Sequence, residues 1–187
     1  GQTNIKRLIA YSSIGHIGYA LAGISTGTLA GYSSSITYIT IYVIMNLGVF
    51  GCIFLMKKDG KYCEDIKDLA GASKQNPLLA IAFLIIMFSL AGIPPLAGFF
   101  AKFYVFMSVI ESGMYTLAIV GLLSTVISAF YYLRIIKIIY FDEIKNSFDK
   151  IKNLGITSTV FLSCSILVLF LLYPSILNNI VKILSIN

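Results

Sequence analysis

Apolar residues along this chain gather into long runs separated by short polar connections, and this pattern predicts membrane-spanning helices. A helix that crosses the hydrocarbon core needs about 20 mostly apolar residues, and five segments meet this requirement. They cover residues 8–24, 36–56, 78–110, 115–141 and 156–173. Residues 175–186 alternate apolar and polar positions at helical spacing, which predicts a helix lying along the membrane interface. We therefore expect an all-α, polytopic helix bundle that forms a single transmembrane domain over residues 1–187.

The composition agrees with lipid as the natural solvent. The chain is 58% hydrophobic and 12% charged, whereas a soluble domain is about 45–50% apolar and about 25% charged. A soluble protein of this size could not bury so much apolar surface. The net charge of +6 would suit a nucleic-acid partner, but the basic residues lie in short connections between apolar runs, as membrane topology requires. We therefore expect a lipid bilayer and no nucleic acid as a partner.

The basic residues are distributed unevenly between the two sides of the predicted membrane. Twelve of the fourteen fall on one side, namely Lys6, Arg7, Lys57, Lys58, Lys61, Lys67, Lys74, Arg134, Lys137, Lys145, Lys150 and Lys152. The other side has Lys182, and Lys102 lies inside a span. Cytoplasmic connections collect Lys and Arg. We therefore expect a bacterial inner-membrane protein with its N-terminal end and the loop over residues 57–76 in the cytoplasm, and its C-terminus in the periplasm.

The tyrosines and cysteines are expected to be structural. The chain has no Trp for an interfacial belt, so tyrosines near the cytoplasmic end of the fourth span are expected to serve. They are Tyr131, Tyr132 and Tyr140. The cysteines have no metal-ligand spacing and are expected to be small hydrophobes. They are Cys52, Cys63 and Cys164. We expect no metal, haem or flavin in this chain.

The third apolar run is too long for one ordinary span. As a single helix, residues 78–110 would extend about 50 Å, against a hydrocarbon core of about 30 Å. Near its centre lie Gly92, Pro94, Pro95 and Gly98, which remove backbone donors and ease departure from helical geometry. The pattern predicts two half-helices broken at residues 92–95, with unwound backbone that is buried in protein or lines a wet cavity. Transporters use such helices at ion sites; a simple proline kink is the alternative.

Lys102 follows this break among apolar and aromatic neighbours. An ammonium at the centre of a spanning helix costs about 2.5–3.5 kcal/mol on insertion scales, and such residues usually face a protein interior or water. Burial disfavours the charged form of an amine, so this lysine is a candidate for loading and releasing a proton. The alternative is that Lys102 extends toward the outer headgroups and has no role in transport.

His16, the single histidine, lies midway along the first span among small residues. A neutral imidazole both donates and accepts a hydrogen bond, so it can relay protons. Small neighbours also permit close helix packing and entry of water. A histidine that is bonded to a neighbouring backbone carbonyl and only ties two helices together is an equally reasonable interpretation.

Two motifs resemble a known family. Residues 2–19, QTNIKRLIAYSSIGHIGY, are similar to the (D/N)IKR-x-x-AYSS-x-x-H-x-G signature of the antiporter-like subunits of respiratory complex I, the NADH:quinone oxidoreductase, and of Mrp-type cation/proton antiporters. Residues 89–99, SLAGIPPLAGF, resemble a second signature of the same group. The continuation over residues 100–106, FAKFYVF, most resembles one particular complex I subunit, whereas another subunit has glutamate in place of Lys102.

The resemblance implies a larger protein than this chain. Members of the family have about fourteen helices in two inverted repeats, and the five spans here match the last five. The resemblance assigns Lys102 to the terminal proton-exchanging lysine of the second half-channel and His16 to the hydrated axis. The first repeat, with its own glutamate and lysine, is missing. We therefore expect either a C-terminal fragment or a split subunit that needs the N-terminal part of the same subunit.

The resemblance also implies a function. We expect a translocase subunit without a redox centre, which takes part in proton translocation coupled to electron transfer from NADH to quinone. FMN, iron–sulfur clusters and quinone would belong elsewhere in the complex, and other membrane-arm subunits would be partners. Two alternatives stay open. One is an Mrp-type cation/proton antiporter subunit, and the other is a structural membrane subunit that transports nothing.

Overall fold

The computed structural model describes residues 2–144, 148–149 and 153–172, and this part of the chain is mostly helical, as the apolar pattern predicted. The main helices are α1 (Ile5–Ile24), α2 (Leu29–Leu55), α4 (Pro77–Ala91), α5 (Ala97–Glu111), α6 (Tyr115–Phe141) and α7 (Leu154–Leu172). Short elements between α2 and α4 are the strands β1 (Lys57–Lys58) and β2 (Lys61–Tyr62), the 3-10 helix η1 (Ile66–Leu69) and α3 (Ala72–Gln75). The predicted interfacial helix over residues 175–186 lies outside the described residues.

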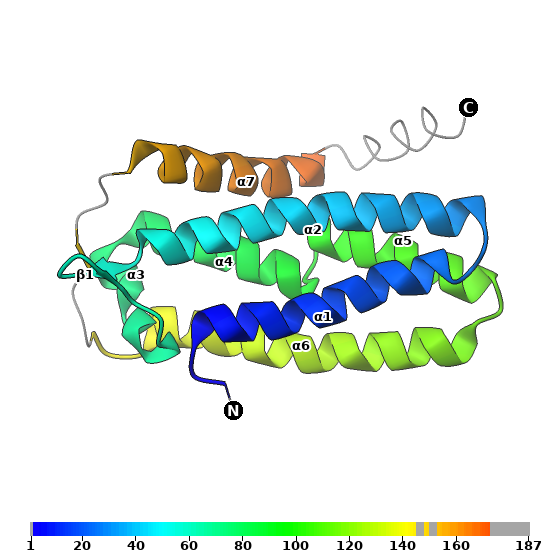
Figure 1. The fold of residues 1–187 in the computed structure, drawn as a ribbon, viewed down its shortest axis with the longest axis horizontal. Coiled ribbons are helices and arrows are strands. Elements are labelled where there is room, and N and C mark those ends of the chain that lie inside the picture. Colours follow the sequence, from blue (N-terminus) through cyan, green and yellow to red (C-terminus); the bar gives the residue numbers. More distant parts are fainter. Residues whose placement is uncertain (1, 145–147, 150–152, 173–187) are drawn as a thin grey trace.

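The helices form an elongated bundle with parallel and antiparallel neighbours (Figure 1). Helix α2 lies in the middle and packs against α1, α4, α5 and α7. Helices α4 and α5 follow each other end to end behind α2, and α6 packs against both of them. The hairpin of β1 and β2, together with η1 and α3, lies at one end of the bundle. This is also the end at which α1 begins and α6 ends.

Helix length separates the elements into two groups. Among the described residues, α2 and α6 are each long and apolar enough to cross a membrane unaided, whereas α4 and the apolar part of α7, Leu154–Phe170, are shorter. Helices α4 and α5 have 15 residues each, so each extends about 22 Å, less than the hydrocarbon core of about 30 Å. Placed end to end, the two half-helices together extend about 45 Å, more than one span requires.

Helix α2 begins earlier than hydropathy predicts, at Leu29 instead of residue 36. The Thr28 side chain caps it by accepting a hydrogen bond from the Gly31 N–H (3.1 Å), a common way to satisfy a free donor at a helix start. The serines that follow lower the hydropathy of this turn, but the buried hydroxyls of Ser34 and Ser35 are satisfied within the protein. Ser35 donates to the carbonyls of Ala20 and Gly31, at 2.8 Å in both cases. Polar residues therefore concealed a helix turn that packs closely on α1.

The loop predicted over residues 57–76 is more ordered than expected. The segment before α1 pairs with it, because Ile5 N–H donates to the Glu64 carbonyl and Ile66 N–H donates to the Thr3 carbonyl, both at 2.8 Å. Lys6 Nζ lies 2.7 Å from Glu64 Oε1. Hydrogen bonds from Lys6 and Asn4 hold the pKa of the Glu64 carboxyl below its ordinary value. The loop therefore fixes the start of α1 at the basic end of the bundle.

The long third run is interrupted between Ala91 and Ala97. Gly92 adopts φ +79°, a left-handed conformation that glycine accepts without strain. The N–H groups of Gly92 and Ile93 both donate hydrogen bonds to the Phe88 carbonyl, at 3.1 and 3.0 Å. Gly98 N–H donates to Ser89 Oγ (3.1 Å), and a Cβ at position 98 would overlap the Ser89 carbonyl. The two half-helices can therefore approach this closely because residue 98 has no side chain.

We predict that Gly98→Ala lowers the stability of the bundle by about 1–3 kcal/mol, the usual cost of overpacking a tight contact. The added methyl must displace backbone and not a flexible side chain. The measurement is the melting temperature of the purified, assembled membrane protein in detergent. Gly18→Ala is the matched control, since a Cβ at position 18 meets nothing within 4 Å. Equal melting temperatures for the two variants would contradict the close contact between α4 and α5.

Candidate functional site

The Lys102 ammonium lies at the carbonyl end of α4. Lys102 is on α5 and is 4% exposed, and its Nζ donates to the carbonyls of Leu90 (3.0 Å) and Ala91 (3.2 Å). The last carbonyls of a helix have no partner within the helix, and the helix dipole favours a cation there. The break between the half-helices therefore provides two free acceptors and a favourable field for the ammonium.

No carboxylate neutralises Lys102 within the described part of the chain. The ion pairs found there join Lys6 to Glu64 and Lys137 to Asp142. The ammonium is buried and directed to two backbone carbonyls inside the bundle, and it does not extend to the protein surface. Partners that carry no charge can hold the ammonium and release it as a neutral amine without leaving an unpaired anion behind. This arrangement suits a group that changes its protonation state.

The residues of the helix break shape the site that holds the Lys102 ammonium. A Cβ at Gly92 would lie 3.0 Å from Lys102 Cδ and 3.2 Å from Nζ, so the glycine leaves room for the lysine as well as accepting positive φ. Pro94 and Pro95 lie in the segment between the half-helices with exposed side chains, and they contribute no N–H group. Gly98 allows α5 to begin close to Ser89. The four predicted break residues therefore lie in or beside the connection that positions Lys102.

His16 occupies a buried site on α1 with both ring nitrogens engaged. It is 2% exposed. Its Nδ1 lies 2.6 Å from the Tyr38 hydroxyl on α2, and its Nε2 lies 3.0 Å from the Tyr132 hydroxyl on α6. Its ring stacks on Tyr42 at a centroid distance of 4.5 Å. A neutral imidazole fits these partners, since one nitrogen donates and the other accepts. The histidine thus joins three helices through groups that can both give and take a proton.

Tyr19 lies between the two predicted site residues. Lys102 Nζ is 5.1 Å from the centroid of the Tyr19 ring, and the same ring meets His16 edge to face at 6.0 Å. None of the hydrogen bonds found in the described residues joins His16 directly to Lys102. The structure therefore places the imidazole and the ammonium beside the same aromatic ring without joining them by a hydrogen bond.

A cavity of about 160 Å³ opens between α1 and α6 beside His16. It is lined by Tyr11, Ser12, Gly15, His16, Tyr19, Ser124, Ile127, Ser128 and Tyr131. Hydroxyl groups from both helices contribute to this lining, although most of its surface is apolar, and the volume has room for several water molecules. The cavity therefore places a water-sized space beside His16 and Tyr19.

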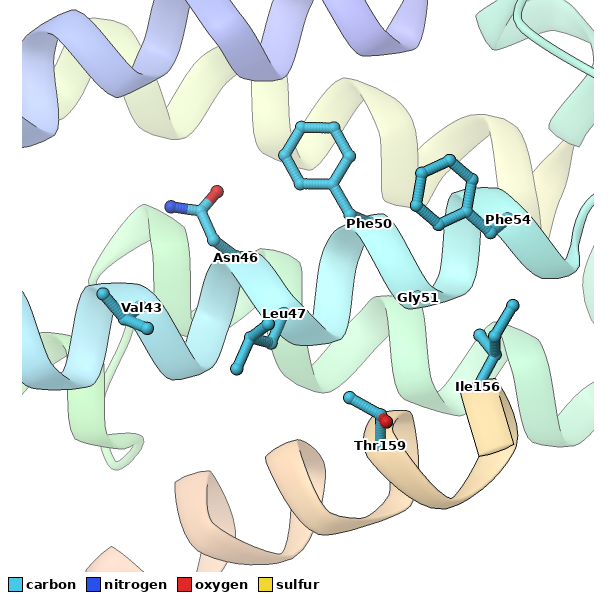
Figure 2. A pocket seen from close by; sticks show the side chains of 8 residues that line it. All are labelled: Val43, Asn46, Leu47, Phe50, Gly51, Phe54, Ile156 and Thr159. Atoms are coloured by element: carbon cyan, nitrogen blue, oxygen red, sulfur yellow. The ribbon is translucent and has the colours of Figure 1, made fainter. Parts of the chain in front are cut away.

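A second cavity, of about 340 Å³, lies between α2 and α7 (Figure 2). On α2 its lining includes Phe50 and Phe54, whose rings point away from α7 in this view, and on α7 it includes Ile156 and Thr159. Its lining carries one amide, Asn46, and one hydroxyl, Thr159, but none of the residues that line it is titratable. Neither Lys102 nor His16 lines it.

Sequence reasoning missed the role of the tyrosines. Tyr132 was expected at the membrane interface, but this is wrong: it is fully buried and bonded to His16. The Tyr140 hydroxyl is also buried, and it has no hydrogen-bond partner in the described residues. Tyr38 was not singled out, although Tyr38 and Tyr42 are four residues apart and so share one helix face. Two tyrosines at this spacing in a chain with a single histidine were the signal that could have predicted the partners of His16.

The curated proteins that resemble this chain include the same subunit from different bacteria. The chain is 58% identical over 182 residues to NADH-quinone oxidoreductase subunit N of Pelagibacter ubique, covering 97% of this chain and 39% of that protein. It is 51% identical over 175 residues to subunit N of Rhodospirillum rubrum, covering 94% of this chain and 36% of that protein. The chain therefore spans well under half the length of the curated relatives that it matches.

Solved structures show the same fold. Respiratory complex I from Thermus thermophilus with bound aureothin contains a chain that matches with a TM-score of 0.78 and 30% identity, over 94% of this chain and 39% of that one. A chain of the Mrp complex from Dietzia matches with a TM-score of 0.80 over 95% of this chain and 41% of that one. The latter is 19% identical, so it supports the fold alone.

The family itself is identified from the sequence. The profile described as "NADH:quinone oxidoreductase/Mrp antiporter, TM" matches residues 1–128, which include both motifs, His16 and Lys102. The match covers more than half of the chain. The subunit that residues 100–106 resembled is subunit N, in agreement with the relatives named above. This chain therefore belongs to the transmembrane family of NADH:quinone oxidoreductase and Mrp antiporter subunits.

Proposed function

We propose that this chain forms the part of an NADH:quinone oxidoreductase membrane subunit in which Lys102 exchanges a translocated proton. The observation that carries the proposal is the seat of the Lys102 ammonium, which is buried and held by two backbone carbonyls at a helix break. Intramembrane ionisable residues in such surroundings are usually functional. The identity of 58% with a subunit N supports this reading of the site.

His16 supplies the inner connection in this proposal. A proton that reaches the cavity beside α1 and α6 is passed through water and the His16–Tyr132 contact, and the Tyr38 and Tyr132 hydroxyls reorient as the imidazole changes tautomer. The opposite ring nitrogen, Nδ1, passes its proton to the Tyr38 hydroxyl, and Tyr38 lies beside the Tyr19 ring that neighbours Lys102. Lys102 releases it to the opposite side of the membrane.

The proposed topology places five spans across the bilayer. Helices α1, α2, α6 and α7 each cross once, and α4 with α5 form one broken span. In the described part of the chain, the basic residues other than Lys102 lie toward the end of the bundle that carries the hairpin. Positively charged loops stay in the cytoplasm, so that end is cytoplasmic and α5 ends toward the periplasm. These spans form the second inverted repeat of a larger subunit.

The remaining parts of the machine lie outside this chain in the proposal. The N-terminal portion of the subunit, which the longer relatives contain, completes the proton path. FMN, iron–sulfur clusters and quinone belong to other subunits, and quinone reduction there changes charges along the membrane arm. Those charges bias the protonation of Lys102. The chain itself contributes amine, imidazole and phenol chemistry to a translocase.

The two rival functions have less support. An Mrp-type antiporter subunit shares the fold, but the structural match to the Mrp complex is 19% identical, whereas the subunit N relatives reach 58% and 51%. A purely structural subunit would have no need to bury Lys102 at a helix break. The first interpretation therefore accounts for both the relatives and the site.

Replacing Lys102 with Ala in the assembled complex tests the proposal directly. Without the amine, the proton acceptor is lost, and loss of a general acid–base group typically slows transfer by about 100-fold or more. We expect fewer protons to be taken up per NADH oxidised, measured in membrane vesicles. Lys137→Ala is the control, because that exposed lysine pairs with Asp142 at the end of α6. Unchanged proton uptake in Lys102→Ala would remove Lys102 from the mechanism.

A second experiment concerns the tyrosines that hold His16. Tyr38→Phe leaves one imidazole nitrogen without its partner at 2.6 Å, and an unsatisfied buried polar group costs about 1–3 kcal/mol. We expect a lower melting temperature and a changed His16 ¹⁵N resonance in solid-state NMR spectra. Tyr42→Phe is the matched control, because Tyr42 contacts the imidazole by stacking. If both variants gave the same His16 spectrum, the Tyr38 hydrogen bond would be excluded.

The topology is tested by chemical labelling of single cysteines. In a chain whose native cysteines are replaced, Lys61→Cys in the hairpin should react with an impermeant maleimide from the cytoplasmic side alone. Glu111→Cys, an exposed position at the end of α5, should react from the periplasmic side. The reverse pattern would overturn the orientation that the positively charged loops predict.

A further inference from the structure

Tyr19 contacts the Lys102 ammonium in a way that the proposed proton exchange does not yet use. The ring centroid lies 5.1 Å from Nζ, within the distance of about 6 Å at which a cation is attracted to the negative face of an aromatic ring. Two of the three ammonium protons are directed to the Leu90 and Ala91 carbonyls. The ring is therefore an additional neighbour with negative potential where, among the described residues, no carboxylate pairs with Lys102.

The Tyr19 ring is fixed in place from a different helix. Its hydroxyl lies 2.9 Å from Ser124 Oγ and accepts a hydrogen bond from Thr125 Oγ1 at 3.1 Å, both on α6. Phe106 of α5 packs edge to face against it at 5.8 Å. Tyr19 is 6% exposed. These contacts leave the ring little freedom, so it forms a rigid wall of the ammonium site instead of a chance neighbour.

We infer that Tyr19 is a positioning residue whose aromatic face holds the charged form of Lys102 against the end of α4. The hydroxyl anchors the ring to α6, and the face of the ring stabilises the ammonium. Because the ring is neutral, the attraction disappears when Lys102 loses its proton, and no counter-ion is left unpaired. This inference rests on the proton exchange at Lys102 proposed above and assigns that exchange a partner.

Tyr19 also lies between His16 and Lys102. Its ring lies nearly perpendicular to the His16 ring at a centroid distance of 6.0 Å, and its side chain lines the cavity between α1 and α6. A proton arriving through that cavity must pass around the ring to reach Lys102. The side chain that stabilises the loaded lysine therefore also blocks a direct contact between His16 and Lys102.

The test is a series of phenylalanines at position 19 that carry zero, one, two or three fluorine atoms, introduced into the assembled complex. Fluorine withdraws electron density from the ring face and barely changes its shape. A cation–π contact in a desolvated site corresponds to a factor of roughly 30 in an equilibrium. The reference of the series is Tyr19→Phe, which loses the anchor to α6 and keeps the ring face. Relative to it, we expect proton uptake per NADH to fall stepwise with each fluorine and to fall roughly ten-fold or more in Tyr19→Leu.

Two controls make the result specific. The same fluorinated series at Phe83, a buried residue of α4 that no described lysine contacts through its ring, should leave proton uptake unchanged. In a Lys102→Met background, Tyr19→Leu should have no further effect, because the ammonium that the Tyr19 ring stabilises is then absent. If Tyr19→Leu fails to assemble, the fluorinated series, which preserves shape, still decides.

The outcomes separate this inference from the function on which it rests. A flat fluorine series in a complex that still requires Lys102 would overturn the role of Tyr19 and leave the proton exchange at Lys102 standing. Normal proton uptake in Lys102→Ala would remove the proposed function itself. A graded fluorine response that disappears in the Lys102→Met background would support the role of Tyr19.

Discussion

The interaction on which this structure depends is the contact between an ammonium group and the free carbonyls at the end of a broken helix. A charged amine in an apolar interior is costly, and so is an unpaired backbone carbonyl. Between α4 and α5 the ammonium gains two acceptors and the free carbonyls gain a donor, because Lys102 Nζ donates to the carbonyls of Leu90 and Ala91. A continuous helix would have satisfied those carbonyls internally and left the lysine without acceptors.

The surrounding residues follow from that constraint. Gly92 supplies the positive φ that ends α4 and leaves space for the lysine, and Gly98 lets α5 start beside Ser89. Helix α2 packs against both half-helices, which holds them in line although no backbone hydrogen bonds run continuously through the break. The core is therefore arranged to keep a discontinuity intact, which a bundle without an internal site would not require.

Many of the helices and the break in the third span could be predicted from the sequence, and the features that could not be predicted have physical causes. Hydropathy finds helices wherever apolar runs are long, so the start and end of α6 were predicted correctly. It missed the first turns of α2, because the hydroxyls of Ser34 and Ser35 lower the hydropathy there although backbone carbonyls satisfy them. The partners of His16 were also missed. A contact between residues 16 and 132 depends on how α1 and α6 pack, and neither periodicity nor composition contains that information.

The tyrosines show why the site is built from neutral groups. A carboxylate beside Lys102 would stabilise the ammonium by Coulomb attraction, but the same carboxylate would be left buried and unpaired once the proton departed, at a cost of several kcal/mol. Carbonyls and an aromatic face give a weaker attraction that leaves no stranded charge. His16, bonded to two phenols, is likewise supported without an ion. A path that must change its charge state repeatedly is therefore better served by dipoles and rings than by salt bridges, and the described part of this bundle places its ion pairs away from Lys102, at Lys6–Glu64 and Lys137–Asp142.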